Sequence, residues 1–213
     1  MQPRAEIYLD ELFHRYPALE GLRPSITNAH HLLTEVFENG GKLLLIGNGG
    51  SASDADHFAG ELLKGFRSKR TLPESFLKRL EAEGMDEQIA GKLQGSLPAI
   101  ALPCQTAAMS AITNDQHPNL VFAQQVLGLG QKGDAILGIT TSGKSKNILA
   151  AFSMARARSI HTIALTGHLA ETIEPLSDVR IGVPAQETTA VQEYHLPIYH
   201  ALCAMVEAHF FPD

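Results

Sequence analysis

A short strand, a glycine-rich loop and a helix follow one another between residues 42 and 61, and this stretch constrains the fold most strongly. The apolar run 43–46 is short enough for a buried strand, and the Gly-Asn-Gly-Gly that follows ends it with residues tolerant of positive φ. Either Ser51 or Ser53 would cap the helix that comes next. Such a loop presents backbone N–H groups at a helix N-terminus, where the helix dipole favours an anion. The stretch therefore predicts a site for a phosphate or another oxyanion.

His57 and Glu61 stand four residues apart on this helix and therefore share one face. A ligand held by the glycine loop would lie within reach of both side chains. The structural alternative is a simple surface pair behind an ordinary strand-to-helix turn, which is common in α/β folds. The adjacency of the loop and the pair favours a functional site.

Composition places the chain among ordinary globular proteins, since its 213 residues suit one sizeable domain and 44% of them are hydrophobic. The net charge of -6 argues against a nucleic-acid-binding surface, and we interpret the basic residues within 67–70 as a solvated loop. Only Cys104 and Cys203 are present, which excludes a disulfide framework and a paired-cysteine zinc motif. We expect a soluble, cytoplasmic protein, because no apolar run matches a membrane span and the N-terminus carries charges where a signal peptide needs an apolar core.

Strand and helix patterns alternate along the chain. Helices are expected at 4–16 and 25–39, in a helical insertion at about 67–95 that breaks at Gly84, and at 106–112, 119–129, 146–158 and 188–211. Besides the first strand, further strands are expected at 98–102, 134–139, 161–165 and 179–183, with a polar loop at 113–118. This alternation predicts a single α/β domain over 1–213, with a five-stranded parallel sheet covered on both faces in a flavodoxin-like or Rossmann-like three-layer sandwich.

A second loop, Thr-Thr-Ser-Gly-Lys-Ser at 140–145, follows the third strand and opens another helix. Its hydroxyl groups at Thr141, Ser142 and Ser145 suit a phosphate monoester, which offers several acceptor oxygens. The alternative is a capped helix that binds nothing. Parallel strands place both loops at one edge of the sheet, where ligands of such folds bind, and this favours phosphate.

The C-terminal helix sets polar side chains among apolar ones: Gln192, Glu193, His195, His200 and His209. A lone histidine on an apolar face is usually a core residue, so we assign no role to His195 or His209. Gln192 and His200 are eight residues apart, which leaves them about 80° apart in direction and roughly 12 Å apart along a straight helix. A kink at Pro197 would narrow this gap. Spacing alone does not select these two residues as a metal-binding pair.

Five motifs in this order make the chain similar to a sugar isomerase (SIS) domain and, within that superfamily, to the phosphoheptose isomerases. They are Gly-Asn-Gly-Gly-Ser at 47–51, His-Phe-Ala-Gly-Glu at 57–61, Asn-Asp at 114–115, the 140–145 loop, and Gln-Glu-Tyr-His at 192–195 with His200 following. The resemblance covers most of residues 25–210. It implies a homotetramer, with zinc in the site, that converts sedoheptulose 7-phosphate into D-glycero-D-manno-heptose 7-phosphate.

The resemblance also implies roles for residues that match the family's motifs. The residues that would contact the substrate are Asn48, Gly49, Gly50, Ser51, Glu61, Asn114, Asp115, Thr140, Thr141, Ser142, Ser145 and Gln192. The zinc ligands are His57, Glu61, Gln192 and His200, and the catalytic pair is Glu61 and His200. Because Gln192 and His200 are poorly placed on one helix, we expect neighbouring subunits to complete each site.

The implied chemistry needs two proton-transferring groups, because an aldose and a ketose interconvert through an enediol. Glutamate suits the carbon base, and histidine can give or take a proton near neutral pH. Zinc would polarise the carbonyl group and stabilise the enediolate. A carboxylate bound tightly to zinc is a weaker base, so either Glu61 shifts its coordination during turnover or the metal mainly orders the site.

Two departures from the family pattern bear on the substrate. Relatives commonly carry Glu-Leu-x-Gly-Arg, whereas this chain has Glu61-Leu-Leu-Lys-Gly, so the arginine is out of register and Arg67 is the nearest substitute. The stretch 71–95 is an insertion that begins close after the helix of His57 and Glu61, where it would reshape the rim of the pocket and bear on the choice of substrate.

Alternative readings are a non-catalytic SIS domain that binds a sugar phosphate as a regulator, a protein-binding module of the replication-initiator-associating type, and a domain whose loops are only caps. The initiator-binding relatives lack the glutamate and the final histidine. This chain keeps Glu61 and His200, which favours catalysis.

Overall fold

The computed structural model describes residues 3–212 and contains one five-stranded sheet among them. Its strands are β1 (Leu43–Gly47), β2 (Ala99–Ala101), β3 (Ala135–Thr140), β4 (His161–Thr166) and β5 (Val179–Gly182). They lie in the order β2-β1-β3-β4-β5, and every neighbouring pair is parallel. Gly47 pairs with Ile139, so β1 and β3 end side by side. The predicted five-stranded parallel sheet is confirmed.

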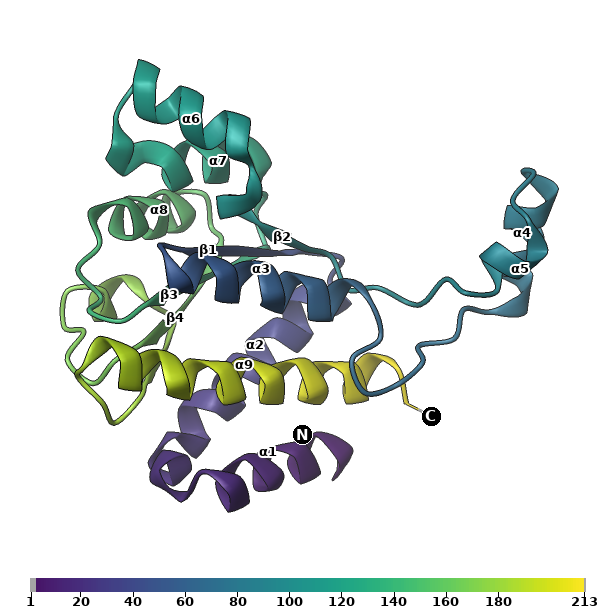
Figure 1. Ribbon diagram of the computed structural model, residues 1–213, viewed down its shortest axis with the longest axis horizontal. Coiled ribbons are helices and arrows are strands. Elements are labelled where there is room, and N and C mark those ends of the chain that lie inside the picture. The colour runs from purple at the N-terminus through teal and green to yellow at the C-terminus, as the bar shows by residue number, and fades with distance from the viewer. Residues whose placement is uncertain (1–2, 213) are drawn as a thin grey trace.

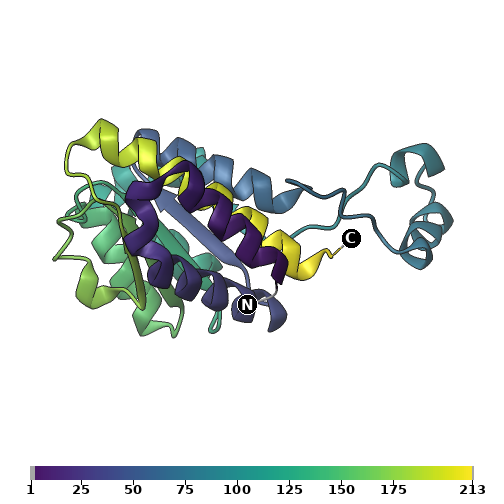
Figure 2. The same cartoon turned by 90° about the horizontal axis from the view of Figure 1, so that it is seen from below.

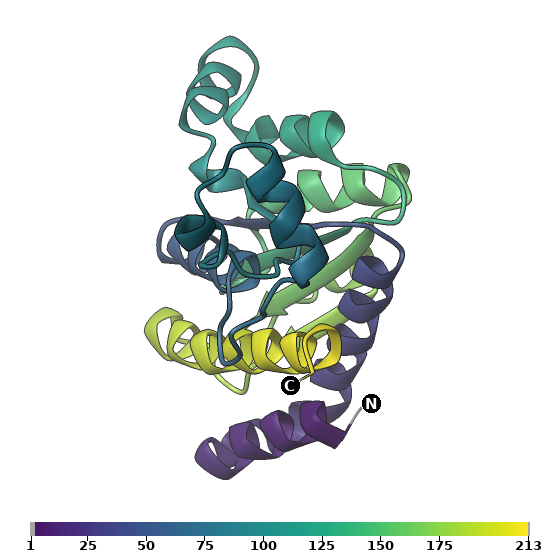
Figure 3. The ribbon, with the colours of Figure 1, turned by 90° about the vertical axis from the view of Figure 1, so that its right-hand side faces the viewer.

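Helices cover both faces of the sheet (Figure 1). One face carries α2 (Arg23–Glu38), α3 (Gly50–Leu63) and α9 (Thr188–Phe210). The other carries α6 (Thr106–Asp115), α7 (Val121–Leu129) and α8 (Lys146–Ala157). Helix α1 (Pro3–Arg15) packs on the outer side of α9 and adds a partial fourth layer (Figure 3).

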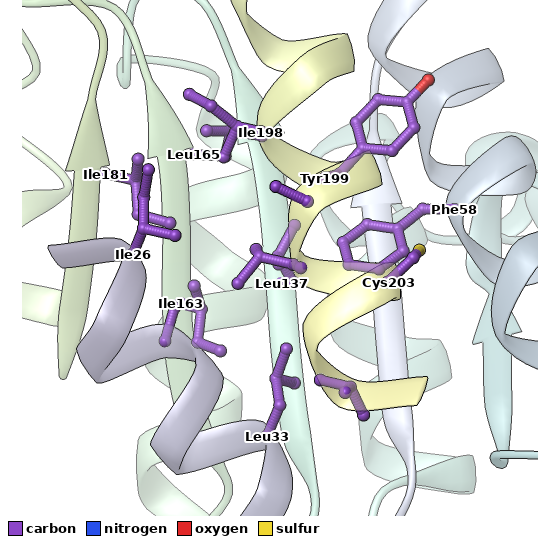
Figure 4. Close-up of a cluster of buried hydrophobic side chains, with 14 of the residues drawn as sticks. Ile26, Leu33, Phe58, Leu137, Ile163, Leu165, Ile181, Ile198, Tyr199 and Cys203 are labelled. Atoms are coloured by element: carbon purple, nitrogen blue, oxygen red, sulfur yellow. The ribbon is translucent and has the colours of Figure 1, made fainter. Parts of the chain in front are cut away.

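Alternate side chains of strands β1 to β4 supply two apolar cores. In β1, Leu43 and Leu45 join the core beneath α2, α3 and α9, while Leu44 and Ile46 join the core beneath α7 and α8. All four side chains are fully buried, as expected for a parallel strand covered on both faces. Figure 4 shows the first of these cores, in which Tyr199 and Cys203 of α9 face Phe58 of α3.

A helical hairpin stands away from the body of the protein (Figures 1 and 2). It consists of α4 (Glu74–Ala82) and α5 (Glu87–Ala90), separated by Gly84 at φ +92°. None of the residues of α4 is buried, and Ala90 of α5, although buried, belongs to neither of the two cores. An antiparallel bridge between Thr71 and Gln94 closes its base.

The structure corrects the predicted start of α3 and end of α6. The residue at the N-cap of α3 is Gly49 and not Ser51 or Ser53, so no side chain caps this helix. Glycine suits the position because the backbone enters the helix at φ +55°. Asn114 and Asp115 belong to the last turn of α6 and not to a loop. After the helix, the backbone N–H groups of Gln116 and His117 both donate to the carbonyl oxygen of Ile112, and Pro118 follows.

The interpretation of residues 67–70 as a solvated loop is wrong for Arg70. Its side chain is buried, and it pairs with Glu207 of α9 at 2.7 Å. The charged side chain of Arg70 can be buried here because it forms an ion pair with the buried carboxylate of Glu207. Among residues 3–212, no helix is long and apolar enough to cross a membrane.

Candidate active site

The turn between β1 and α3 is built so tightly that it requires glycine. A Cβ atom on Gly47 would lie 2.3 Å from the carbonyl oxygen of Ser51, so β1 meets the first turn of α3 at backbone distance. Gly49 then takes a left-handed conformation that glycine adopts without strain. The turn therefore brings the N-terminus of α3 to the carboxyl edge of the sheet.

The turn between β3 and α8 repeats this arrangement on the neighbouring strand. Gly143 has φ +66°, and its N–H donates to the hydroxyl oxygen of Thr140 at 3.3 Å. The two turns are joined by the amides of Asn48 and Asn147, which donate to each other at 3.0 and 2.8 Å. This reciprocal pair was not found from the sequence, since the two residues lie 99 positions apart.

A cavity of about 260 Å³ lies between the two turns. Eight of the predicted substrate-binding residues line it: Asn48, Gly49, Gly50, Ser51, Thr140, Thr141, Ser145 and Gln192. Two helix N-termini and several hydroxyl and amide groups meet here, which is the chemistry that an anionic oxygen group requires.

Four predicted substrate-binding residues lie outside this cavity: Glu61, Asn114, Asp115 and Ser142. Ser142 is exposed, and its hydroxyl oxygen accepts from the N–H of Lys144 at 3.3 Å. Asn114 donates to Asp115 at 2.7 Å, and both are exposed at the end of α6. Within one chain, the expected grouping of these two residues with the glycine loop is not seen.

The proposed reactive residues gather farther along α3. His57 Nε2 lies 3.3 Å from Glu61 Oε1, and the imidazole rings of His57 and His200 are 5.1 Å apart between centroids. Glu61 also binds Lys64 at 2.7 Å. Helix α3 therefore carries the glycine turn at its start and the pair of His57 and Glu61 near its end.

Tyr199 fixes the orientation of His57. Its ring stacks on Phe58, and its hydroxyl group points away from the core toward α3 (Figure 4). The hydroxyl group donates to Asp54 at 3.3 Å and lies 3.0 Å from His57 Nδ1. Because its one proton goes to Asp54, the hydroxyl oxygen accepts from His57 Nδ1–H. On the other side of the ring, Nε2 faces Glu61 Oε1 at 3.3 Å.

The surroundings set the protonation of the site. Burial opposes ionisation of Glu61, but the hydrogen bond and charge of Lys64, with His57, lower the pKa of this carboxyl group below its ordinary value. Burial and the neighbouring His57 lower the pKa of His200. Near neutral pH the site therefore holds a carboxylate beside a neutral imidazole, which is a base beside a group able to exchange a proton.

His200 has an unsatisfied nitrogen. Its ring lies against Phe66 with 5.3 Å between ring centroids, and its Nε2 is buried with no hydrogen-bond partner in the part of the chain that the structure describes. His200 also borders a second cavity of about 290 Å³ that lies beneath α1. Arg67 lines the same cavity, but its guanidinium group holds Glu11 at 3.0 and 3.2 Å. Arg67 thus lies beside the reactive residues without pointing a free charge at them.

The four residues expected to bind zinc do not converge. Gln192 faces the first cavity beside Gly50, while His200 lies against His57, in line with their wide separation along the helix. Over residues 3–212, no group of three or more His, Cys, Asp or Glu side chains is arranged to hold a metal ion. His57, Glu61 and His200 are nevertheless neighbours, and imidazole and carboxylate groups are ligands that zinc accepts.

Comparison with known proteins identifies relatives that match almost the whole chain. The SIS domain family matches residues 105–208. A phosphoheptose isomerase from Helicobacter pylori is 40% identical over 193 residues, which cover 91% of this chain and 88% of the relative. One from Nitratiruptor is 41% identical over 90% of this chain and 89% of its own. The solved structure of phosphoheptose isomerase from Neisseria gonorrhoeae superposes with a TM-score of 0.74 at 32% identity, covering 96% of this chain and 97% of the other. The chain belongs to the phosphoheptose isomerase family of SIS-domain proteins.

Proposed function

We propose that this protein is an aldose-ketose isomerase that converts sedoheptulose 7-phosphate into D-glycero-D-manno-heptose 7-phosphate through an enediol. The observation that carries the proposal is the layout of α3, with an anion-binding cavity at Gly50 and the pair of His57 and Glu61 toward its other end. A sugar phosphate anchored by its phosphate group would extend along this helix toward the reactive residues. Family membership supports the choice of a heptose phosphate.

The phosphate group is proposed to lie between the two turns. Asn48, the glycines beside it, and the hydroxyl groups of Thr141 and Ser145 would donate to its oxygens. Gln192 reaches over Gly50 and would contact the adjoining hydroxyl groups of the sugar. No positive side chain lines this cavity among the described residues, so the two helix dipoles supply most of the favourable field.

Glu61 is proposed to move the proton between carbons, and His200 the proton between oxygens. The Glu61 carboxylate removes a proton from C1 of the ketose and returns it to C2. His200, neutral because its pKa is lowered, relays the proton from the C1 hydroxyl group to the oxygen on C2. Its Nε2 has no hydrogen-bond partner among the described residues, so no other group of the chain competes for it.

Zinc is the proposed cofactor. His57, Glu61 and His200, which are neighbours, would hold it, whereas Gln192 faces the first cavity. The supporting observations are that His57 Nε2 and Glu61 Oε1 face each other and that His200 Nε2 is unsatisfied, since imidazole and carboxylate groups are ligands that zinc accepts. When bound, zinc would polarise the carbonyl group and stabilise the negative charge of the enediolate. Glu61 would keep its role as base only by loosening from the metal during turnover.

Tyr199→Phe tests how the protein presents His57 to zinc. The substitution removes the hydroxyl group that accepts from His57 Nδ1, so we expect zinc affinity to fall by about 10–100-fold. Competition with a chromophoric chelator measures this loss. Tyr194→Phe on the same helix removes a hydroxyl group away from His57 and should leave the affinity unchanged. Equal affinities for wild type and Tyr199→Phe would show that His57 is not the ligand.

We infer that the active assembly is a homotetramer with sites near subunit interfaces. Asn114 and Asp115 lie outside the cavity of their own chain, and a neighbouring subunit would bring them to a site. Light scattering at micromolar concentration should report four subunits. A monomer that isomerises the substrate would contradict the inference. A cytoplasmic location is part of the proposal, supported by two cysteines that form no disulfide.

The isomerase proposal is tested by hydrogen exchange at carbon. The protein, with and without added zinc, is incubated in heavy water with a panel of ketose and aldose phosphates, and deuterium bound to carbon is followed by NMR. We expect exchange at C1 and C2 of the seven-carbon substrates. Binding of a sugar phosphate with no exchange in any member of the panel would favour the non-catalytic alternative.

A further inference from the structure

Arg70 is an unusual residue in the loop that follows α3. It is 3% exposed and has φ +43°, a conformation that costs a non-glycine residue free energy. Its guanidinium group donates to Glu207 Oε1 at 2.7 Å, to the carbonyl oxygen of Leu62 at 2.6 Å and to that of Glu61 at 3.1 Å. Arg70 therefore caps the C-terminal end of the helix that carries Glu61.

Glu207 is the second half of this arrangement. Its carboxylate accepts from the backbone N–H groups of Phe66, Arg67 and Ser68 at 2.7, 2.7 and 3.0 Å, in addition to Arg70. The loop 66–70 is thus folded around one buried carboxylate on α9. The sequence contains a signal for it, because Glu207 is the only charged residue in the apolar run 201–208.

Both partners are connected directly to the proposed reactive residues. Glu207 lies seven residues after His200, two turns along the same face of α9. The N–H group of Phe66 bonds to Glu207, and the ring of Phe66 rests against the ring of His200. On the other side, the carbonyl group of Glu61 itself accepts from Arg70. The pair therefore links the backbone of the base to the helix that carries the acid.

We propose that Arg70 and Glu207 are positioning residues that set the spacing between Glu61 and His200. This assignment rests on the isomerase function proposed above. Without the pair, α3 and α9 would still be held by the apolar contacts of Phe58 and Tyr199, but the last turn of α3 and the loop beneath His200 would lose their common anchor. Neither residue touches the phosphate-binding cavity. The pair should therefore govern the chemical step and not substrate binding.

The experiment uses two variants and one matched control. Glu207→Gln removes the charge of the carboxylate, and Arg70→Lys keeps a positive charge but cannot bond to the carboxylate and two carbonyl groups at once. Asp134→Asn is the control, because Asp134 is also buried and accepts from Lys42 Nζ at 2.6 Å and from two backbone N–H groups. It lies at the opposite edge of the sheet, where β3 begins. Unfolding midpoints in urea are measured for all three variants.

We expect kcat to fall about 10–100-fold in Glu207→Gln and Arg70→Lys, with KM unchanged within twofold. Asp134→Asn should lower the unfolding midpoint but keep kcat within twofold of wild type. A purely structural pair would instead give variants that lose stability and keep kcat, as the control does. Unchanged kcat in Glu207→Gln and Arg70→Lys would overturn the assignment. A loss of kcat in Asp134→Asn as large as in these two variants would also overturn it.

A second measurement separates this assignment from the isomerase function. Two-dimensional NMR of zinc-free protein labelled with ¹⁵N-histidine reports the surroundings of the His57 and His200 rings without turnover. We expect these ring signals to shift in both variants and to stay in place in Asp134→Asn. If wild type shows no isomerisation, the proposed function fails while the ring signals still decide the positioning role. Unshifted ring signals in both variants would refute that role.

Discussion

Glu61→Gln is expected to slow carbon-bound deuterium exchange by about 10²–10⁴-fold while leaving sugar-phosphate affinity unchanged. The amide has the shape of the carboxylate but cannot accept a proton from carbon. The native carboxyl group has a pKa below its ordinary value, so it is ionised and ready to act as a base at neutral pH. Exchange is followed by NMR in heavy water, and affinity by isothermal titration with the same sugar phosphate.

The matched control is Glu74→Gln on the exposed hairpin. Glu74 is also a helical glutamate paired with a lysine about one turn away, Lys78 at 2.6 Å, but it lies far from the site. The control should exchange deuterium at the wild-type rate. Near wild-type exchange in Glu61→Gln would remove this residue as the carbon base, and a large loss of affinity would give it a binding role in place of a chemical one.

Gly47→Ala is expected to abolish tight sugar-phosphate binding and to destabilise the fold. The added Cβ atom would lie 2.3 Å from the carbonyl oxygen and 2.5 Å from the carbonyl carbon of Ser51, both of which are backbone atoms. The first turn of α3 must move away from β1, which opens the cavity and costs about 1–3 kcal/mol of unfolding free energy, as overpacking does. We expect at least a tenfold loss of affinity in titration, with the stability change read from urea unfolding.

Gly60→Ala provides the comparison on the same helix. Beyond its chain neighbours and the backbone of its own helix, no atom lies within 4 Å of a Cβ at that position, so the substitution should stabilise the helix by about 0.5–1 kcal/mol and leave binding unchanged. If Gly47→Ala bound the sugar phosphate as tightly as wild type, the turn after β1 would not be part of the phosphate site.

The sequence was sufficient for the features that depend on local pattern. Short apolar runs such as the one that begins at Leu43 mark the strands, and glycine with hydroxyl residues marks both turns. These signals are visible because strand burial and turn geometry each depend on only a few consecutive residues. Parallel pairing then brings the turns to one edge of the sheet, where the cavity lies.

Features that depend on long-range contacts could not be predicted in the same way. Arg70 lies in a basic run that reads as solvated, and its burial depends on Glu207, 137 positions away. The bond between Tyr199 and His57 likewise spans 142 positions and depends on the rotation of α9 over α3. Pairings of this kind follow from packing of whole helices, which a single sequence does not specify.

On the proposed function, helix α9 would fix the distance between the phosphate group of the substrate and its reacting carbons. Gln192 borders the first cavity beside Gly50 and His200 lies against His57, and eight helical residues separate the two by roughly 12 Å along the axis. On the proposed function, the carbon chain that links phosphate to carbonyl must match this fixed interval. Selection by chain length therefore resides in the rise of a rigid helix, and substitutions in the cavity walls would alter affinity without changing the preferred number of carbons.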